Sequence, residues 1–157
     1  KNGKKVNSGK KVEKLHFDEK NITLVDYPVS WEKSVDIAFK PIVSRGNADH
    51  AYVKKCKQLF YKNYGNMLIG PNVYIPHAEP TNNLKKPDIQ ITIFDKPVYN
   101  PEGTPFHVMV GLVPTRSNDH VPFLLKLNNF FIRKDAINKV LAAKDTKEIV
   151  ALIESEM

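Results

Sequence analysis

Two of the five histidines in this 157-residue sequence stand where an imidazole could take part in group transfer. His77 follows Pro76 at the end of the apolar run 72–75. Proline donates no ladder hydrogen bond and holds the residue before it extended, so a strand should end just before His77. Ligand sites of α/β sheets lie at strand ends. His77 is therefore the first candidate for a functional residue, although a surface or core histidine is the simpler interpretation.

His120 has the second of these settings. It lies in "TRSNDHVPF", where an apolar strand ends and a helix is expected to begin. A helix start offers free backbone N–H groups and the positive end of the dipole, which suit a phosphate or an oxyanion. Arg116, Ser117 and Asn118 add hydrogen-bond donors in the same loop. If the two strand ends are neighbours, His77 and His120 face one another across a small polar site.

Other catalytic and metal-binding arrangements have little support. His107 lies within an apolar strand and is predicted to be structural, and His16 and His50 belong to no cluster. A zinc site needs clustered cysteine and histidine ligands, which this sequence lacks. There is no G-x-S-x-G elbow and no G-x-x-x-x-G-K loop, so neither a hydrolase of that type nor an ATP site is indicated. A Ser-His-Asp triad stays open, because triads assemble in space.

The spacing of apolar residues predicts the elements that position these histidines. Strands are predicted over residues 21–27, 88–94 and 106–113, and over 67–75 in two pieces broken by Gly70 and Pro71. Helices are predicted from residue 31 to a stop at Gly46, over 49–61, from 118 or 119 onward, around 137–141 and over 145–153. The strand 106–113 is almost entirely apolar, as a central strand covered on both faces would be. The order of helices, strands and helices indicates a single layered α/β or α+β domain.

Local signals set several boundaries. Ser30 and Asp49 are the expected N-caps of the first two helices, and Asp145 with Glu148 forms a capping-box pattern for the last. The segment "KPVYNPEGTP", residues 96–105, is expected to be a turn-rich connector. In the helix after His120, four residues are expected to point inward: Val121, Leu124, Leu125 and Leu127.

Composition places limits on the class of protein. A chain of this length fits one domain with a sizeable core. The single cysteine, Cys56, cannot form an internal disulfide, and no signal peptide is apparent, so a reducing, cytoplasmic setting is expected. No stretch approaches the roughly 20 apolar residues that span a bilayer, so no membrane insertion is expected.

The net charge of +7 is concentrated at one end of the sequence. Residues 1–14 hold six lysines and one glutamate, so five of the seven net positive charges lie there. We expect a flexible basic tail or linker over 1–14 and a single domain over 15–157. An arm that contacts phosphates or acidic partners is the alternative. Aromatic residues do not interleave with these lysines, so a stacking platform for single-stranded nucleic acid is not indicated, and the domain itself is not expected to bind nucleic acid.

The segment "GPNVYIPHAEP" resembles the active-site segment of enzyme IIA domains of the mannitol/fructose class (type 2). Those domains belong to the bacterial phosphoenolpyruvate-dependent sugar phosphotransferase system and carry an apolar run that ends in P-H-A or P-H-G. The resemblance continues upstream in "WEKSVDIAFKPIVSRGNADHAYVKKC". Downstream it continues in "DKPVYN", "VGLVPTRSNDHVPFLLKLNNFF" and "AAKDTKEIVALI", in the order of the family. The resemblance as a whole spans roughly residues 15–153.

The resemblance implies a three-layer α/β sandwich, in which a mixed β-sheet is flanked by helices on both faces. It implies that His77 accepts a phosphoryl group from phospho-HPr and passes it to a IIB domain or protein, which links it to a membrane IIC component. His120 matches the family's second histidine and would stabilise the phosphoryl group, with Ser117 and Asn118 as further donors. Lys62 stands where mannitol-type members carry an arginine and would supply positive charge.

The chemistry agrees with this interpretation. A neutral imidazole, with an ordinary pKa of about 6.5, is a competent nucleophile near neutral pH. Phosphoryl transfer depends mainly on positioning and charge stabilisation, so no metal, nucleotide or other cofactor is expected. The incoming partner is expected to meet a shallow apolar rim, whose residues the sequence does not locate.

Two alternatives stay open. Similar domains form the C-terminal parts of transcriptional antiterminators and activators, where histidine phosphorylation controls a regulator. The basic leader would then be a linker. An unrelated basic binding module is the other alternative, and salt-dependent binding to nucleic acid would distinguish it.

Overall fold

A computed structural model describes residues 15–81 and 86–155 of the chain. The elements run in the order η2 (Glu19–Asn21), β1 (Ile22–Val25), α1 (Trp31–Ser44), α2 (His50–Asn63), η3 (Tyr64–Asn66), β2 (Leu68–Ile69), β3 (Val73–Tyr74), β4 (Asp88–Tyr99), β5 (Pro105–Val113), α3 (Val121–Phe131), α4 (Ala136–Ala142) and α5 (Thr146–Glu154). The predicted tail over 1–14 lies outside the described residues, as do residues 156 and 157 of the predicted domain.

The strands form one mixed sheet in the order β1-β4-β5-β3-β2. β4 pairs antiparallel with β5 and parallel with β1, whereas β5 also pairs parallel with β3. β2 pairs antiparallel with β3 and closes the sheet at one side. The apolar strand β5 is therefore central, which confirms the sequence-based prediction.

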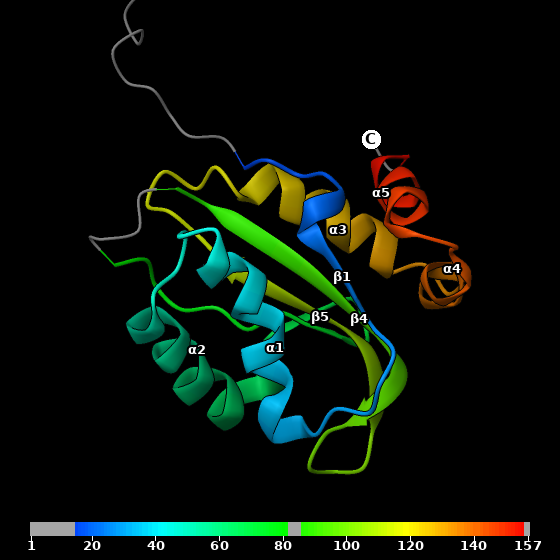
Figure 1. Cartoon of the computed structure of the whole chain (residues 1–157), viewed down its shortest axis with the longest axis horizontal. Coiled ribbons are helices and arrows are strands. Elements are labelled where there is room, and N and C mark those ends of the chain that lie inside the picture. Colours follow the sequence, from blue (N-terminus) through cyan, green and yellow to red (C-terminus); the bar gives the residue numbers. More distant parts are fainter. Residues whose placement is uncertain (1–14, 82–85, 156–157) are drawn as a thin grey trace, which may run out of the picture.

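Helices cover both faces of this sheet (Figure 1). α1 and α2 pack on one face, around Val35, Phe39 and Phe60, whereas α3, α4 and α5 pack on the other. Successive side chains of β4 point to opposite faces of the sheet, so this strand contributes to the apolar core on each face. Ile89, Ile91 and Ile93 pack on the face covered by α3, α4 and α5, and the residues between them point to the face covered by α1. The three-layer α/β sandwich is confirmed.

The helix ends follow the predicted signals with small differences. Asp49 caps α2, since its carboxylate accepts a hydrogen bond of 2.8 Å from the Tyr52 N–H. Ser30 occupies the N-cap of α1 without a side-chain bond. Asp145 caps α5, but the Glu148 carboxylate accepts from the N–H of Lys144 and so does not complete a capping box.

Three predictions about local structure are wrong. β4 continues through Lys96, Pro97 and Val98 to Tyr99, so the expected connector over 96–105 is shorter than predicted. A register irregularity between Ile93 and Val98 accommodates the proline, which cannot donate to a regular ladder.

The other two concern α3. This helix begins at Val121, with His120 as its N-cap, and so starts slightly later than predicted. Leu127 is buried as expected, but Val121 and Leu125 are 41% and 61% exposed. Phe130 and Phe131 are buried with Leu127, and these larger side chains direct a different face of the helix inward.

None of the helices in the described ranges has both the length and the apolar composition required to cross a bilayer.

Candidate active site

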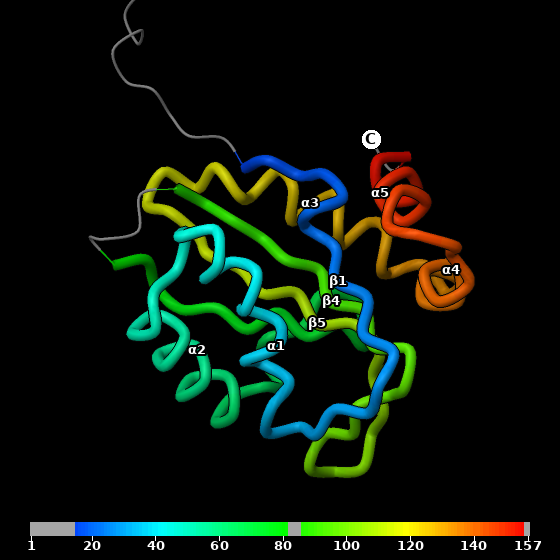
Figure 2. Tube along the Cα trace, viewed as in Figure 1, coloured from blue at the N-terminus to red at the C-terminus, as the bar shows by residue number. Residues whose placement is uncertain are grey.

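Two loops meet beyond the ends of the parallel neighbours β3 and β5. One follows β3 and contains His77, and the other follows β5 and leads to His120 at the start of α3. A backbone hydrogen bond of 3.3 Å from the Leu112 N–H, near the end of β5, to the Pro76 carbonyl joins the first loop to β5. In the trace, the green segment after β3 and the yellow segment after β5 reach the same end of the sheet (Figure 2). The arrangement expected from the sequence therefore exists.

A pocket of about 630 Å³ opens between these loops. Its lining combines the two histidines with groups of both charges and with apolar residues from α2 and the segment before β2. The lining residues of this pocket are Leu59, Met67, His77, Ala78, Glu79, Pro80, Pro114, Thr115, Arg116, Asn118 and His120.

One ring nitrogen of His77 is committed to the backbone. Its Nδ1 lies 2.7 Å from the carbonyl oxygen of Ile75. A carbonyl oxygen only accepts hydrogen bonds, so Nδ1 must carry the proton. Within the described part of the chain no group bonds to Nε2. In the neutral ring this nitrogen therefore has a free lone pair, as a nucleophile requires.

His120 shows the opposite arrangement. The residue is 9% exposed, and its Nδ1 is buried without a hydrogen-bond partner in the described residues. A buried N–H without an acceptor is costly and rare, so the neutral ring carries its proton on Nε2. Burial, together with the nearby imidazole of His77, lowers the pKa of His120, although Asp119 acts against this shift. His120 is thus a neutral donor at neutral pH.

The loop before His120 is held by its own side chains. The Ser117 hydroxyl donates to the Asp119 carboxylate over 2.6 Å and lies 2.9 Å from the Thr115 hydroxyl. Ser117 does not line the pocket, so the structure gives it a loop-ordering contact. Asn118 does line it, with a φ of +61°, a left-handed conformation that asparagine tolerates better than most residues.

Of the two basic residues considered from the sequence, the one that lines the pocket is Arg116 and not Lys62, which the family resemblance implied. Lys62 is exposed on the last turn of α2 and is not among the pocket residues. Its neighbour Tyr61 turns toward α1, where its hydroxyl donates to the Trp31 carbonyl over 2.9 Å. Arg116 lines the pocket instead. In the sequence, Arg116 could be recognised as a pocket residue because it lies four residues before His120, in a loop rich in hydrogen-bond donors.

Comparisons with known proteins identify the family to which this sequence is similar. The sequence profile of the family described as "Phosphoenolpyruvate-dependent sugar phosphotransferase system, EIIA 2" matches residues 15–156. The multiphosphoryl transfer protein of Haemophilus influenzae is 24% identical over 144 residues, which cover 90% of this chain and 28% of that protein. This chain thus spans little more than a quarter of that relative. The ascorbate-specific PTS system EIIA component of Escherichia coli K12 is 19% identical over 140 residues, covering 87% of this chain and 91% of that protein.

Solved structures share the fold. The complex of enzyme IIAMTL and phosphorylated enzyme IIBMTL from Escherichia coli aligns with a TM-score of 0.72 and 18% identity, covering 90% of this chain and 99% of that chain. Because the profile match covers almost the whole domain and encloses both histidine loops, this chain belongs to the EIIA 2 family of the phosphoenolpyruvate-dependent sugar phosphotransferase system.

Proposed function

We propose that this domain is a phosphocarrier in which Nε2 of His77 accepts a phosphoryl group from phospho-HPr and passes it to a IIB component for sugar uptake. The observation that carries the proposal is the bond of Nδ1 to the Ile75 carbonyl, which fixes the tautomer and leaves Nε2 as the nucleophile. Family membership supports the same reaction class.

The transfer step is balanced without a metal or nucleotide. The Nε2 lone pair attacks phosphorus, a P–N bond to His77 forms, and the bond between phosphorus and the donor breaks with its electron pair going to the donor. The ring of His77 then carries positive charge, which the Nδ1–H bond to Ile75 stabilises. Onward transfer to IIB reverses these changes.

Three groups of the second loop are suited to the charge of the transferring phosphoryl group. The neutral His120 ring can donate from Nε2 to an equatorial oxygen. The Asn118 amide and the Arg116 guanidinium line the same pocket. Hydrogen bonds and positive charge placed in advance are the main source of catalysis in phosphoryl transfer.

The partner must reach His77 through the mouth of the pocket. Leu59 lines the pocket and is 40% exposed, and Val121 adjoins His120 and is 41% exposed. These side chains fit the expected apolar rim, which a partner protein would cover during transfer. The structural neighbour from Escherichia coli is a complex of enzyme IIAMTL with phosphorylated enzyme IIBMTL. We place the reaction in the cytoplasm, where IIB would connect it to a membrane IIC component.

The test is incubation with phosphoenolpyruvate, enzyme I and HPr, followed by mass spectrometry under conditions that preserve phosphohistidine. We expect one added phosphoryl group on the wild type, mapped to His77, and none on His77→Ala. Absence of label on the wild type, or equal label on the variant, would reject the proposal. Labelled protein is then mixed with IIB components, and loss of label to one of them supports transport. Label that no IIB removes would favour the regulatory alternative.

A further inference from the structure

We infer that Tyr52 is a positioning residue for His77, because its buried hydroxyl takes the place of a ladder hydrogen bond between the His77 loop and strand β5. The inference rests on the proposed function of His77. It concerns a side chain that touches neither the phosphoryl group nor the partner.

The register of the sheet shows which bond is replaced. In the parallel pairing of β3 with β5, Val73 lies opposite Val108 and Tyr74 opposite Met109. Continued by three residues, this register would place His77 opposite Leu112. In a parallel ladder the N–H and C=O of Leu112 would then bond to residues 76 and 78, on either side of His77.

Only one of these two bonds forms directly. The Leu112 N–H donates to the Pro76 carbonyl over 3.3 Å. The second bond is bridged by Tyr52, whose hydroxyl lies 2.8 Å from the Leu112 carbonyl and 3.2 Å from the Ala78 nitrogen. The hydroxyl therefore accepts from Ala78 and donates to Leu112, as an inserted water molecule would.

Tyr52 is well suited to this role. It is fully buried in the first turn of α2, and its ring packs edge-to-face on Phe39. Burial raises the pKa of the Tyr52 hydroxyl far above its usual range, so the hydroxyl keeps the proton that it donates. Its backbone N–H is in turn capped by Asp49. Ala78 is 3% exposed, so water has little access to replace the hydroxyl.

The consequence concerns where Nε2 points. The backbone on both sides of His77 is tied to Leu112, once directly and once through Tyr52, while its ring is tied to Ile75. Without the hydroxyl, the C-terminal side of the His77 loop loses its link to β5. Displacement of a reacting group by about 1 Å is enough to reduce a rate on the order of 100-fold.

The experiment compares Tyr52→Phe with Tyr61→Phe, a control that also removes one hydroxyl bonded to a backbone carbonyl of the same molecule. Tyr61 does not line the pocket. Initial rates of phosphorylation are measured over a range of phospho-HPr concentrations, alongside thermal unfolding of both variants. For Tyr52→Phe we expect a maximal rate lower by about ten-fold or more, with an unchanged half-saturating concentration of phospho-HPr. Tyr61→Phe should keep the wild-type maximal rate.

A wild-type maximal rate in Tyr52→Phe would overturn the inference, as would an equal loss of rate in Tyr61→Phe. A second measurement needs no variant. The Ala78 amide of the wild type should exchange its hydrogen as slowly as the amides of β5, and rapid exchange would also overturn the inference. If the wild type takes no phosphoryl group, the proposed function fails, and amide exchange still decides whether Tyr52 holds the loop.

Discussion

Two polar clusters lie at the same end of the central strands, and they differ in how many of their hydrogen-bonding groups have partners. Asp88, at the start of β4, lies opposite Val113 at the end of β5. The cluster around Asp88 therefore lies at the same end of the strands as the histidine pocket, whose lining includes Pro114, the residue after β5. One cluster ties α1 to the sheet, and the other contains His77.

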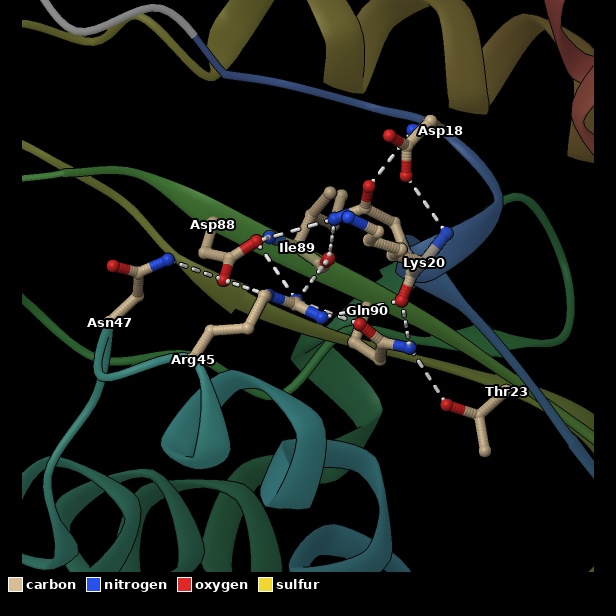
Figure 3. A network of polar contacts seen from close by, with 9 residues as sticks. Asp18, Lys20, Thr23, Arg45, Asn47, Asp88, Ile89 and Gln90 are labelled. Atoms are coloured by element: carbon tan, nitrogen blue, oxygen red, sulfur yellow. Dashed lines mark hydrogen bonds and ion pairs between the residues drawn. The ribbon is translucent and has the colours of Figure 1, made fainter.

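The cluster around Asp88 is saturated (Figure 3). Arg45 donates from Nε and Nη2 to the two Asp88 oxygens over 2.8 and 3.0 Å, and Nη2 also reaches the Gln90 side chain. Asn47 donates to the same carboxylate over 2.9 Å. The Gln90 amide in turn donates to Thr23 and to the Lys20 carbonyl. Arg45 and Asp88 pair with each other, and both carboxylate oxygens of Asp88 accept several hydrogen bonds, so this cluster stabilises the fold.

The histidine pocket keeps open positions. The buried Nδ1 of His120 has no partner within the described ranges, and Nε2 of His77 has none there either. Asn118 holds a left-handed backbone next to them. Unsatisfied groups and strained backbone reduce stability, and they persist at sites where a ligand or a reaction uses them. The comparison separates a saturated cluster that holds α1 to the sheet from open groups that lie where we propose the reaction takes place.

The largest expected effect tests the open cluster. His120→Ala removes the neutral donor from the pocket, and loss of one such donor lowers rates by about 10²–10³-fold. The free energy of unfolding should fall only by the packing lost with the buried ring, because the Nδ1 of His120 makes no hydrogen bond in the described residues. Phosphorylation rates with phospho-HPr and denaturant unfolding measure the two quantities. A variant that unfolds more easily but transfers the phosphoryl group at the normal rate would show that His120 has a structural role. That result would contradict the distinction between the two clusters.

Arg45→Met tests the saturated cluster. It leaves the Asp88 carboxylate buried without its main partner, and we expect a loss of about 2 kcal/mol in the free energy of unfolding. This value allows for the partial exposure of Arg45. Phosphoryl transfer by the folded variant should stay close to wild type. Lys57→Met is the control, because the exposed pair of Lys57 with Asp36 should contribute at most about 0.5 kcal/mol. A large loss of transfer in Arg45→Met would show that the clusters are coupled.

Asn118 separates backbone strain from chemistry. Asn118→Gly keeps the left-handed backbone and removes the amide, whereas Asn118→Ala removes both. We expect Asn118→Ala to lose about 1 kcal/mol of stability and Asn118→Gly to lose less. If the amide contacts the phosphoryl group, both variants should transfer several-fold more slowly. Normal transfer by Asn118→Gly would limit the role of Asn118 to its backbone conformation.

The smallest effect is the pH dependence of stability. The pKa of His120 is lowered in the folded state, so as pH falls through about 6.5 the unfolded chain binds a proton that the folded chain does not. The free energy of unfolding of the wild type should therefore decrease between pH 7.5 and pH 5.5. In His120→Ala this decrease should be smaller. Urea unfolding at both pH values measures it, and equal decreases would show that His120 is not held neutral.

Local features of this fold were predictable because they depend on neighbours in sequence. Asp49 caps α2 through a residue three positions away, and the alternation of β4 is a property of one strand. Even the end of β3 follows from Pro76. The buried face of α3 was not predictable, because the helix carries apolar residues on more than one face. Only packing against the sheet determines that Leu127 is buried and Leu125 is not.

The site was predictable in part for the same reason. His77 and His120 could be selected by their positions at strand and helix ends, but their proximity depends on β3 lying beside β5, which is a long-range pairing. The direction of Lys62 depends on the rotation of α2, and sequence position alone does not fix it. Tyr52 gave no signal, because its hydroxyl acts on backbone groups that are 26 and 60 residues away.

The end of β5 links the proposed phosphorylation of His77 to the correct assembly of the sheet. Leu112 receives the Pro76 and Tyr52 contacts and also faces Ile89 of β4. A shift of β5 by one residue would present the opposite face of the strand at this point and remove both anchors of the His77 loop. The central strand must therefore be in its native register before His77 is held in place, so under the proposed function a chain in which β5 is out of register should accept the phosphoryl group more slowly.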